Sequence, residues 1–211
     1  MEPLSLRHVL SLLAELHGVP ESRESALKAR FQHFQKIGFP AETKTGRGKP
    51  AAYTVSAIVK IIMAFELVAL RIPPEQAVEI LGGIDWEDAG ERLRGAGEYL
   101  VRSPDDGRQR LNSFAMKGAL LVLDPDGLMG LRGEEGANPL PREKVAWVAL
   151  SDEDHPWDLS KPGRHFVAIN VTRVLTDAAL ALEKVGVQRS DFGKGLLAWF
   201  DQLEDELHEN D

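Results

Sequence analysis

Three basic side chains, Lys44, Arg47 and Lys49, lie close together in a segment that also contains Gly46 and Gly48. Ammonium and guanidinium groups on a glycine-rich turn suit phosphate binding, because their charge is complementary and the backbone can approach closely. The spacing differs from that of a nucleotide-binding P-loop, which needs Gly-x-x-x-x-Gly-Lys-Ser/Thr after a strand. The segment therefore predicts a phosphate-facing surface of the kind that contacts DNA.

The charge distribution along the chain supports this interpretation. The 211 residues carry a net charge of -8 with a pI of about 5.3. Residues 1–60 nevertheless hold nine Lys/Arg and five acids, so they carry 9 − 5 = +4 and leave −8 − 4 = −12 for the remainder. This asymmetry indicates that the N-terminal part faces a polyanion. The alternative is chance variation in the charge of surface loops.

Other groups that could carry chemistry form weaker patterns. Asp152, Glu153, Asp154 and His155 offer ligands that a hard metal ion accepts, although such acidic loops are usually solvated. The six histidines have no paired metal-ligand spacing, and the chain contains no cysteine. We therefore expect no enzymatic activity, no cofactor and no metal site.

The segment before the basic loop has the pattern of a helix with two contrasting faces. Residues 21–37 place Leu27, Phe31 and Phe34 on one side, at positions i, i+4 and i+7. The opposite side is small, polar and basic, which suits insertion into a DNA major groove. Its residues are Ser22, Ser25, Ala29, Gln32 and Lys36, flanked by Lys28 and His33.

The remaining periodicities predict an α+β protein. Helices are expected at 5–16, 54–70, 75–81, 85–101, 171–185 and from 190 onward. Strands are expected at 114–123, 128–131, 145–150 and 165–170, the first two joined as a hairpin. These elements suggest an N-terminal all-α domain (1–82), a linker helix (83–104) and a C-terminal α+β domain (105–211) with a small antiparallel sheet and two helices.

Three pieces of the N-terminal part resemble the MerR-like winged helix-turn-helix family of DNA-binding proteins. The run Phe34-Gln35-Lys36-Ile37-Gly38-Phe39 is similar to the end of that family's recognition helix. Tyr53-Thr54 is similar to the point where the wing closes and the third helix begins. Residues 70–81 are similar to the turn and short helix that complete the domain.

The resemblance implies a winged helix-turn-helix fold for residues of about 5–81. Gln32 and Ala51 stand where the family often has arginine, so those two arginine contacts are not carried over. Position on the helix and in the loop suggests that Lys28, Lys36, Arg47 and Lys49 supply equivalent charge. The full set of expected DNA-binding residues is Ser22, Ser25, Lys28, Gln32, His33, Lys36, Lys44, Thr45, Arg47, Lys49 and Tyr53.

We therefore predict a sequence-specific transcription regulator that binds double-stranded DNA as a homodimer through its C-terminal half. A small-molecule or protein effector is left open. We expect a cytoplasmic, nucleoid-associated protein without a membrane segment, because the most apolar stretch, 55–70, contains Lys60 and Glu66. The alternatives are an architectural or recombination-directing DNA-binding protein and a protein-interaction or ligand-binding module without a DNA role.

Overall fold

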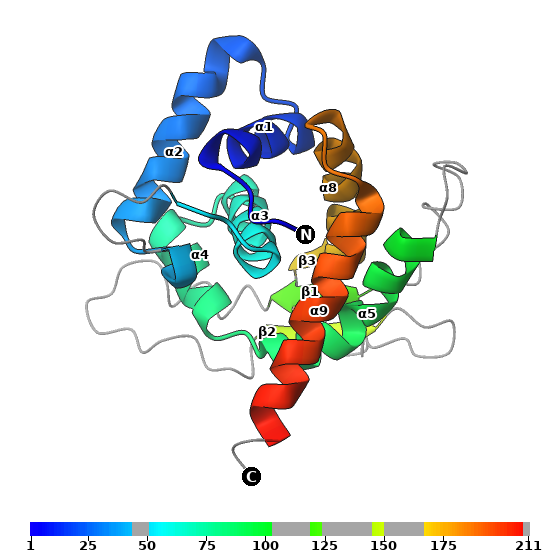
Figure 1. The fold of residues 1–211 in the computed structure, drawn as a ribbon. Helices are drawn as coiled ribbons and strands as arrows, with labels where there is room; N and C mark the ends of the chain where they lie inside the picture. Colours follow the sequence, from blue (N-terminus) through cyan, green and yellow to red (C-terminus); the bar gives the residue numbers. More distant parts are fainter. Residues whose placement is uncertain (44–50, 103–118, 124–144, 150–166, 209–211) are drawn as a thin grey trace, which may run out of the picture.

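The computed structural model describes residues 1–43, 51–102, 119–123, 145–149 and 167–208 (Figure 1). Its helices are α1 (Leu6–Leu16), α2 (Glu24–Lys36), α3 (Val55–Ala69), α4 (Pro74–Gly82), α5 (Trp86–Arg102), α8 (Val171–Lys184) and α9 (Arg189–His208). Its strands are β1 (Ala119–Leu123), β2 (Val145–Ala149) and β3 (Val167–Asn170), and the short 3-10 helices η1 (Glu21–Arg23) and η2 (Ala41–Thr43) lie on either side of α2. The predicted α+β fold class is confirmed.

Helix α1 and the turn after it begin the fold. The Ser5 hydroxyl caps α1 by accepting a hydrogen bond from the backbone N–H of His8. The helix ends before Gly18, whose φ of 59° lies in the left-handed region that glycine tolerates. The chain then passes through η1 into α2. The single helix predicted for 21–37 is therefore a 3-10 turn followed by an α-helix.

Residues 44–50 lie outside the described residues. The segments immediately before and after them make contacts with other parts of the N-terminal region. On the N-terminal side, the Glu42 carboxylate of η2 accepts a hydrogen bond from the Lys60 ammonium of α3 at 2.9 Å. On the C-terminal side, Tyr53 and Leu4 form an antiparallel bridge with N···O distances of 2.8 and 2.9 Å. Thr54 then caps α3, because its hydroxyl accepts a hydrogen bond from the backbone N–H of Ala57.

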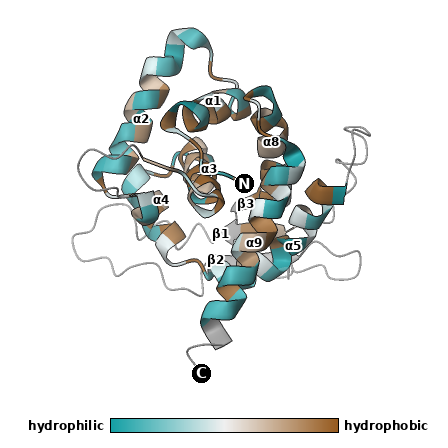
Figure 2. Ribbon diagram, viewed as in Figure 1, coloured by the Kyte–Doolittle hydropathy of each residue, from teal (hydrophilic) through white to brown (hydrophobic). Residues whose placement is uncertain are grey.

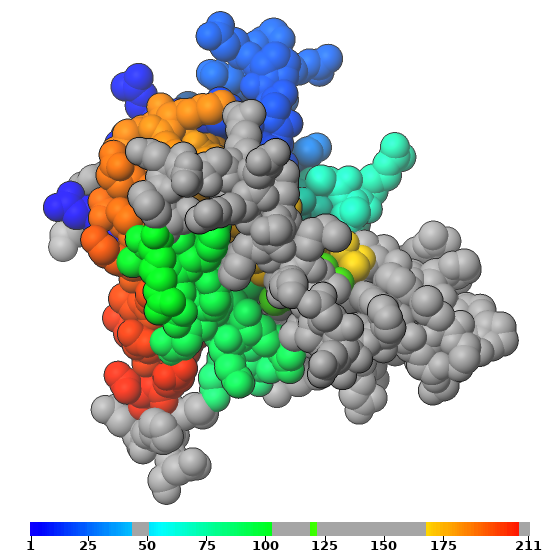
Figure 3. Space-filling model, turned by 90° about the vertical axis from the view of Figure 1, so that its right-hand side faces the viewer, coloured from blue at the N-terminus to red at the C-terminus, as the bar shows by residue number. Residues whose placement is uncertain are grey.

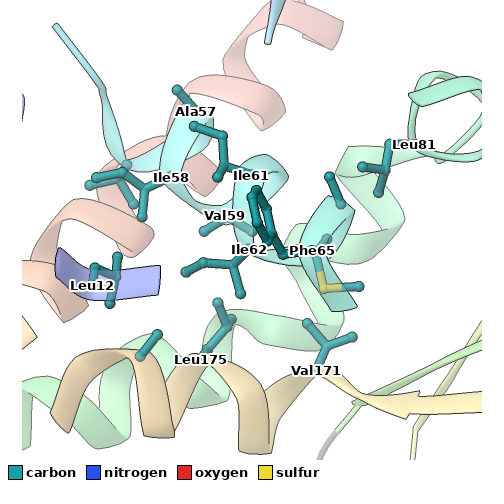
Figure 4. Packing of buried hydrophobic residues seen from close by; sticks show 14 of the residues in the cluster. Leu12, Ala57, Ile58, Val59, Ile61, Ile62, Phe65, Leu81, Val171 and Leu175 are labelled. Atoms are coloured by element: carbon teal, nitrogen blue, oxygen red, sulfur yellow. The ribbon is translucent and has the colours of Figure 1, made fainter. Parts of the chain in front are cut away.

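Helix α3 lies at the centre of the core. Its residues are largely hydrophobic, whereas those of α2 are largely hydrophilic (Figure 2). Ile58 and Ile62 of α3 face Leu12 of α1 and Leu175 of α8 (Figure 4). A helix that is apolar on most sides is stable only when other elements cover each apolar side. Helices α4, α8 and α9 pack on α3 and supply much of that cover.

Helices α5 and α9 form a close antiparallel pair, seen side by side in Figure 3. The pair depends on glycine, because a Cβ on Gly193 would lie 2.9 Å from both the Gly97 carbonyl oxygen and the Leu100 Cβ. The guanidinium group of Arg94 connects the two helices by donating to Asp201 at 2.9 Å and to Glu204 at 2.5 Å.

The sheet has the strand order β2-β1-β3, and both pairings are antiparallel. Leu121 of the central strand is opposite Trp147 of β2 and Ile169 of β3. The predicted strands near 145–150 and 165–170 are confirmed as β2 and β3. β1 pairs with these two strands, whereas the hairpin partner expected for it, 128–131, lies outside the described part of the chain. Asn170 ends β3 and caps α8 through its side chain.

Helices from the two ends of the chain lie against each other. α1 packs on α8, and α3 packs on α8 and α9, so a single hydrophobic cluster contains residues from all four helices. The Lys184 ammonium of α8 also pairs with the Glu15 carboxylate of α1. The division of the chain into 1–82, 83–104 and 105–211 stays a prediction.

Candidate nucleic-acid interface

Helix α2 has the two faces that its sequence predicts. Leu27, Phe31 and Phe34 are buried and hold the helix on the core. Phe34 packs on Phe65 of α3 with a ring-centroid distance of 5.5 Å. Because the buried stripe fixes the rotation of α2, the opposite face is directed to solvent.

Most of the expected DNA-binding residues that the structure describes lie on this solvent face. Ser25, Lys28, Gln32 and Lys36 are exposed on α2, and Ser22 is exposed in η1. Two acidic residues, Glu21 of η1 and Glu24 in the first turn of α2, are exposed near this face, and Glu24 lies close to Ser25 and Lys28. The other predicted contacts, Lys44, Thr45, Arg47 and Lys49, fall outside the described residues.

His33 lies at the flank of this face and already has a partner. Its Nε2 is 2.7 Å from the Glu75 carboxylate of α4, and its side chain is 44% exposed. This contact links α2 to α4. The pKa of Glu75 lies below its usual value because of a hydrogen bond within its own residue and the hydrogen bond with His33. In the structure His33 therefore holds α2 against α4, beside the predicted binding face.

Tyr53 differs from the other predicted contacts because its side chain is fully buried, with 0% exposed. Its ring packs edge-on against Phe31 of α2, with the centroids 5.8 Å apart. Its hydroxyl accepts a hydrogen bond from the Gln35 side-chain amide at 2.9 Å. Burial raises the pKa of Tyr53, and the Gln35 hydrogen bond opposes that rise in part. In this conformation Tyr53 supports α2 from within the core and does not reach a ligand on the surface.

The acidic residue nearest to the basic loop is neutralised by α3. Glu42 pairs with Lys60 and accepts a second hydrogen bond, from the Ser56 hydroxyl at 3.3 Å. The negative charge of Glu42 is therefore paired with the positive charge of Lys60. Lys60 in turn lies over the Trp86 ring of α5, 5.8 Å from its centroid.

A groove of about 540 Å³ between α1 and α2 adds two residues that the sequence analysis did not select. Arg7 and Ser11 of α1 line it together with Ser25 and Lys28 of α2. Arg7 and Ser11 are four residues apart and both exposed, so they lie on one side of α1. That spacing is the signal that could have identified them. The groove extends the polar surface of α2 onto α1, and Glu24 lines it together with the basic residues Arg7 and Lys28.

The structure brings together no metal-ligand set within the described residues, where no group of three or more His, Asp or Glu side chains could hold an ion. The Asp152–His155 segment falls outside that part of the chain. Of the described helices, none is both long and apolar enough to cross a membrane. No protein-family model matches the chain, and neither a curated protein nor a solved structure shows significant similarity to it.

Proposed function

We propose that residues of about 5–81 form a MerR-like winged helix-turn-helix domain and that the protein is a cytoplasmic transcription regulator that binds duplex DNA. The observation that carries the proposal is the solvent face of α2, where Ser25, Lys28, Gln32 and Lys36 are exposed and the one acidic residue of the helix, Glu24, lies in its first turn. Short side chains allow a helix to approach base edges, and lysines reach the flanking phosphates.

The residues have distinct roles in this mechanism. Ser25 and Gln32 contact base edges in the major groove, while Lys28 and Lys36 contact phosphates. Arg7 contacts the DNA backbone. Its position in the same groove as Lys28, between α1 and α2, supports this role. In the loop after α2, the proposed contacts to phosphates or to the minor groove are Lys44, Thr45, Arg47 and Lys49. The protein catalyses no reaction in this proposal.

The proposed regulator acts as a homodimer. One winged helix contacts only a few base pairs, whereas a two-fold symmetric dimer contacts two DNA half-sites. The aromatic face of α9 is covered within the chain: Phe192, Leu196 and Phe200 are at most 1% exposed. A dimer therefore uses other surfaces of the C-terminal half. Light scattering of the purified protein measures the oligomeric state directly. A monomeric mass at micromolar concentration contradicts the proposed homodimer.

Fluorescence anisotropy with labelled random-sequence duplexes tests DNA binding. The association constant is expected to fall linearly with salt concentration on a log–log plot. Lys28→Gln and Lys36→Gln should each make that slope shallower by about 0.9, the value for one lost phosphate contact. Lys194→Gln removes the same charge from an exposed position on α9 and should leave the slope unchanged.

Two results would contradict the proposal. The first is an absence of binding at the lowest salt concentration by a protein whose circular dichroism shows it to be folded. The second is an equal effect of all three lysine substitutions, which would mean that α2 has no special role. Either result would favour a module that binds protein or a small ligand.

A further inference from the structure

A second cavity, of about 250 Å³, lies where the end of α1, helix α2 and helix α3 meet. Leu27 and Phe65 are buried and Val19 is partly buried, so these side chains give the cavity an apolar wall. Arg23 and Arg30 line it from the side of α2. The cavity therefore combines apolar surface with cationic groups, the composition that selects an amphiphilic anion.

The two arginines are suited to share one ligand. Arg23 ends η1 and Arg30 lies in α2, and both line the same cavity. Within the described residues, neither guanidinium group has a carboxylate at ion-pair distance. A guanidinium group binds carboxylates through two parallel N–H donors, which gives both strength and direction.

The His17 ring also lines the cavity. Its Nε2 is buried and has no hydrogen-bond partner. Its Nδ1 is 3.9 Å from the nearest Glu66 carboxylate oxygen, which is too long for a hydrogen bond. The His17 ring also packs on Phe65, with centroids 5.9 Å apart.

We propose that this cavity binds a small monocarboxylate with an apolar body, of about the size of phenylacetate. The carboxylate contacts the guanidinium groups of Arg30 and Arg23. The apolar body packs against Val19, Leu27 and Phe65. The bound molecule touches α1, α2 and α3 together. The site does not depend on the proposed DNA-binding function, since no residue on the solvent face of α2 takes part in it.

Isothermal titration calorimetry of the full-length protein with sodium phenylacetate tests the site. Saturable binding is expected, and 2-phenylethanol, which lacks the charge, should bind much more weakly. Arg30→Gln should weaken phenylacetate binding about tenfold, the equivalent of one charge-assisted contact. Ala69→Leu should abolish binding, because Ala69 lines the cavity at an exposed position where a larger side chain takes up space without disturbing the core.

Arg102→Gln is the matched control, because it removes the same group from an exposed position near the end of α5. Its affinity for phenylacetate should equal that of the unaltered protein. Circular dichroism establishes that each variant is folded. A signal that does not saturate up to the solubility of phenylacetate overturns the proposal. Saturable binding that is unaffected by both Arg30→Gln and Ala69→Leu also overturns it, since the acid then binds elsewhere.

Discussion

At the scale of single residues, Glu42 connects the base of the predicted wing to α3. Partial burial by itself raises the pKa of Glu42, but the hydrogen bonds from Lys60 and Ser56 and the charge of Lys60 outweigh it. The pKa of Glu42 in the folded protein therefore lies below its ordinary value of 4.5. A carboxyl group with a lowered pKa stabilises the fold above its unfolded pKa, and this stabilisation is lost as pH falls through the folded pKa.

Glu42→Gln should accordingly destabilise the protein in a pH-dependent way. Near neutral pH the free energy of unfolding should fall by about 1 kcal/mol, as expected for a partly buried ion pair. At about pH 3 the difference should be smaller, because the carboxyl group becomes protonated in the unaltered protein as well. Urea unfolding at the two pH values measures this.

Glu98→Gln is the control for this comparison. Its carboxylate pairs with Arg102 within α5 at 3.5 Å, and the two side chains are 45% and 78% exposed. Such an exposed pair contributes little, so this variant should unfold almost as the unaltered protein does. A Glu42→Gln effect of the same size at both pH values would show that the ion pair is not its cause.

At the scale of elements, the α5–α9 pair depends on close backbone approach. Gly90 of α5 faces Phe200, Gly97 faces Leu197, and Gly193 of α9 faces Leu100. Each of these glycines costs the helix some intrinsic stability, because glycine loses more backbone entropy on folding than alanine does. That cost is offset by packing, since the absence of Cβ allows the two helices to make contact along their length.

Gly193→Ala should therefore destabilise the protein by about 1–3 kcal/mol, the usual cost of overpacking. The added Cβ would meet the backbone oxygen of Gly97 at 2.9 Å, and backbone cannot move away as a flexible side chain can. Thermal or urea unfolding measures the change. The higher helix propensity of alanine opposes this loss without cancelling it.

Gly95→Ala tests the same substitution on an exposed position of α5. There the gain in helix propensity should dominate and stabilise the protein by up to about 1 kcal/mol. If Gly193→Ala stabilised the protein as much as Gly95→Ala does, the conclusion that the α5 and α9 backbones approach each other closely would be contradicted.

At the scale of the whole molecule, the N-terminal helices depend on helices from the other end of the chain. α8 covers α1, and α8 and α9 cover α3. Contacts also run from η2 to α9: Glu42 pairs with Lys60, Lys60 lies over Trp86, and the Trp86 and Trp199 rings are 5.6 Å apart. The predicted DNA-binding part is thus physically continuous with α5 and α9.

A fragment ending at residue 82 should therefore fold poorly. It would expose the sides of α1 and α3 that α8 and α9 cover, including Leu12 and Ile62, which are 0% exposed in the full chain. Fully exposing such a side chain costs about 1.5–3 kcal/mol, so a few of them exceed the stability of a small domain. Circular dichroism and urea unfolding compare the fragment with the full chain. A cooperative unfolding transition in the fragment would contradict this expectation and support an independent domain at 1–82.

The amino-acid sequence by itself determined most of the secondary structure and the face of α2 that is directed to solvent. Helical periodicity and capping residues such as Thr54 and Asn170 act locally, so they can be interpreted without knowing the partners of each element. The spacing of Leu27, Phe31 and Phe34 defines the buried side of α2 and hence its exposed basic side. The DNA-binding function inferred from that face stays a proposal.

The tertiary structure alone decided which groups meet. It buries Tyr53 beneath α2, pairs His33 with Glu75, and brings Arg7 and Lys28 to the same groove. It also covers the aromatic face of α9 with α5. These outcomes arise from contacts between residues far apart in the chain, and periodicity along one element shows which side is buried but not what covers it.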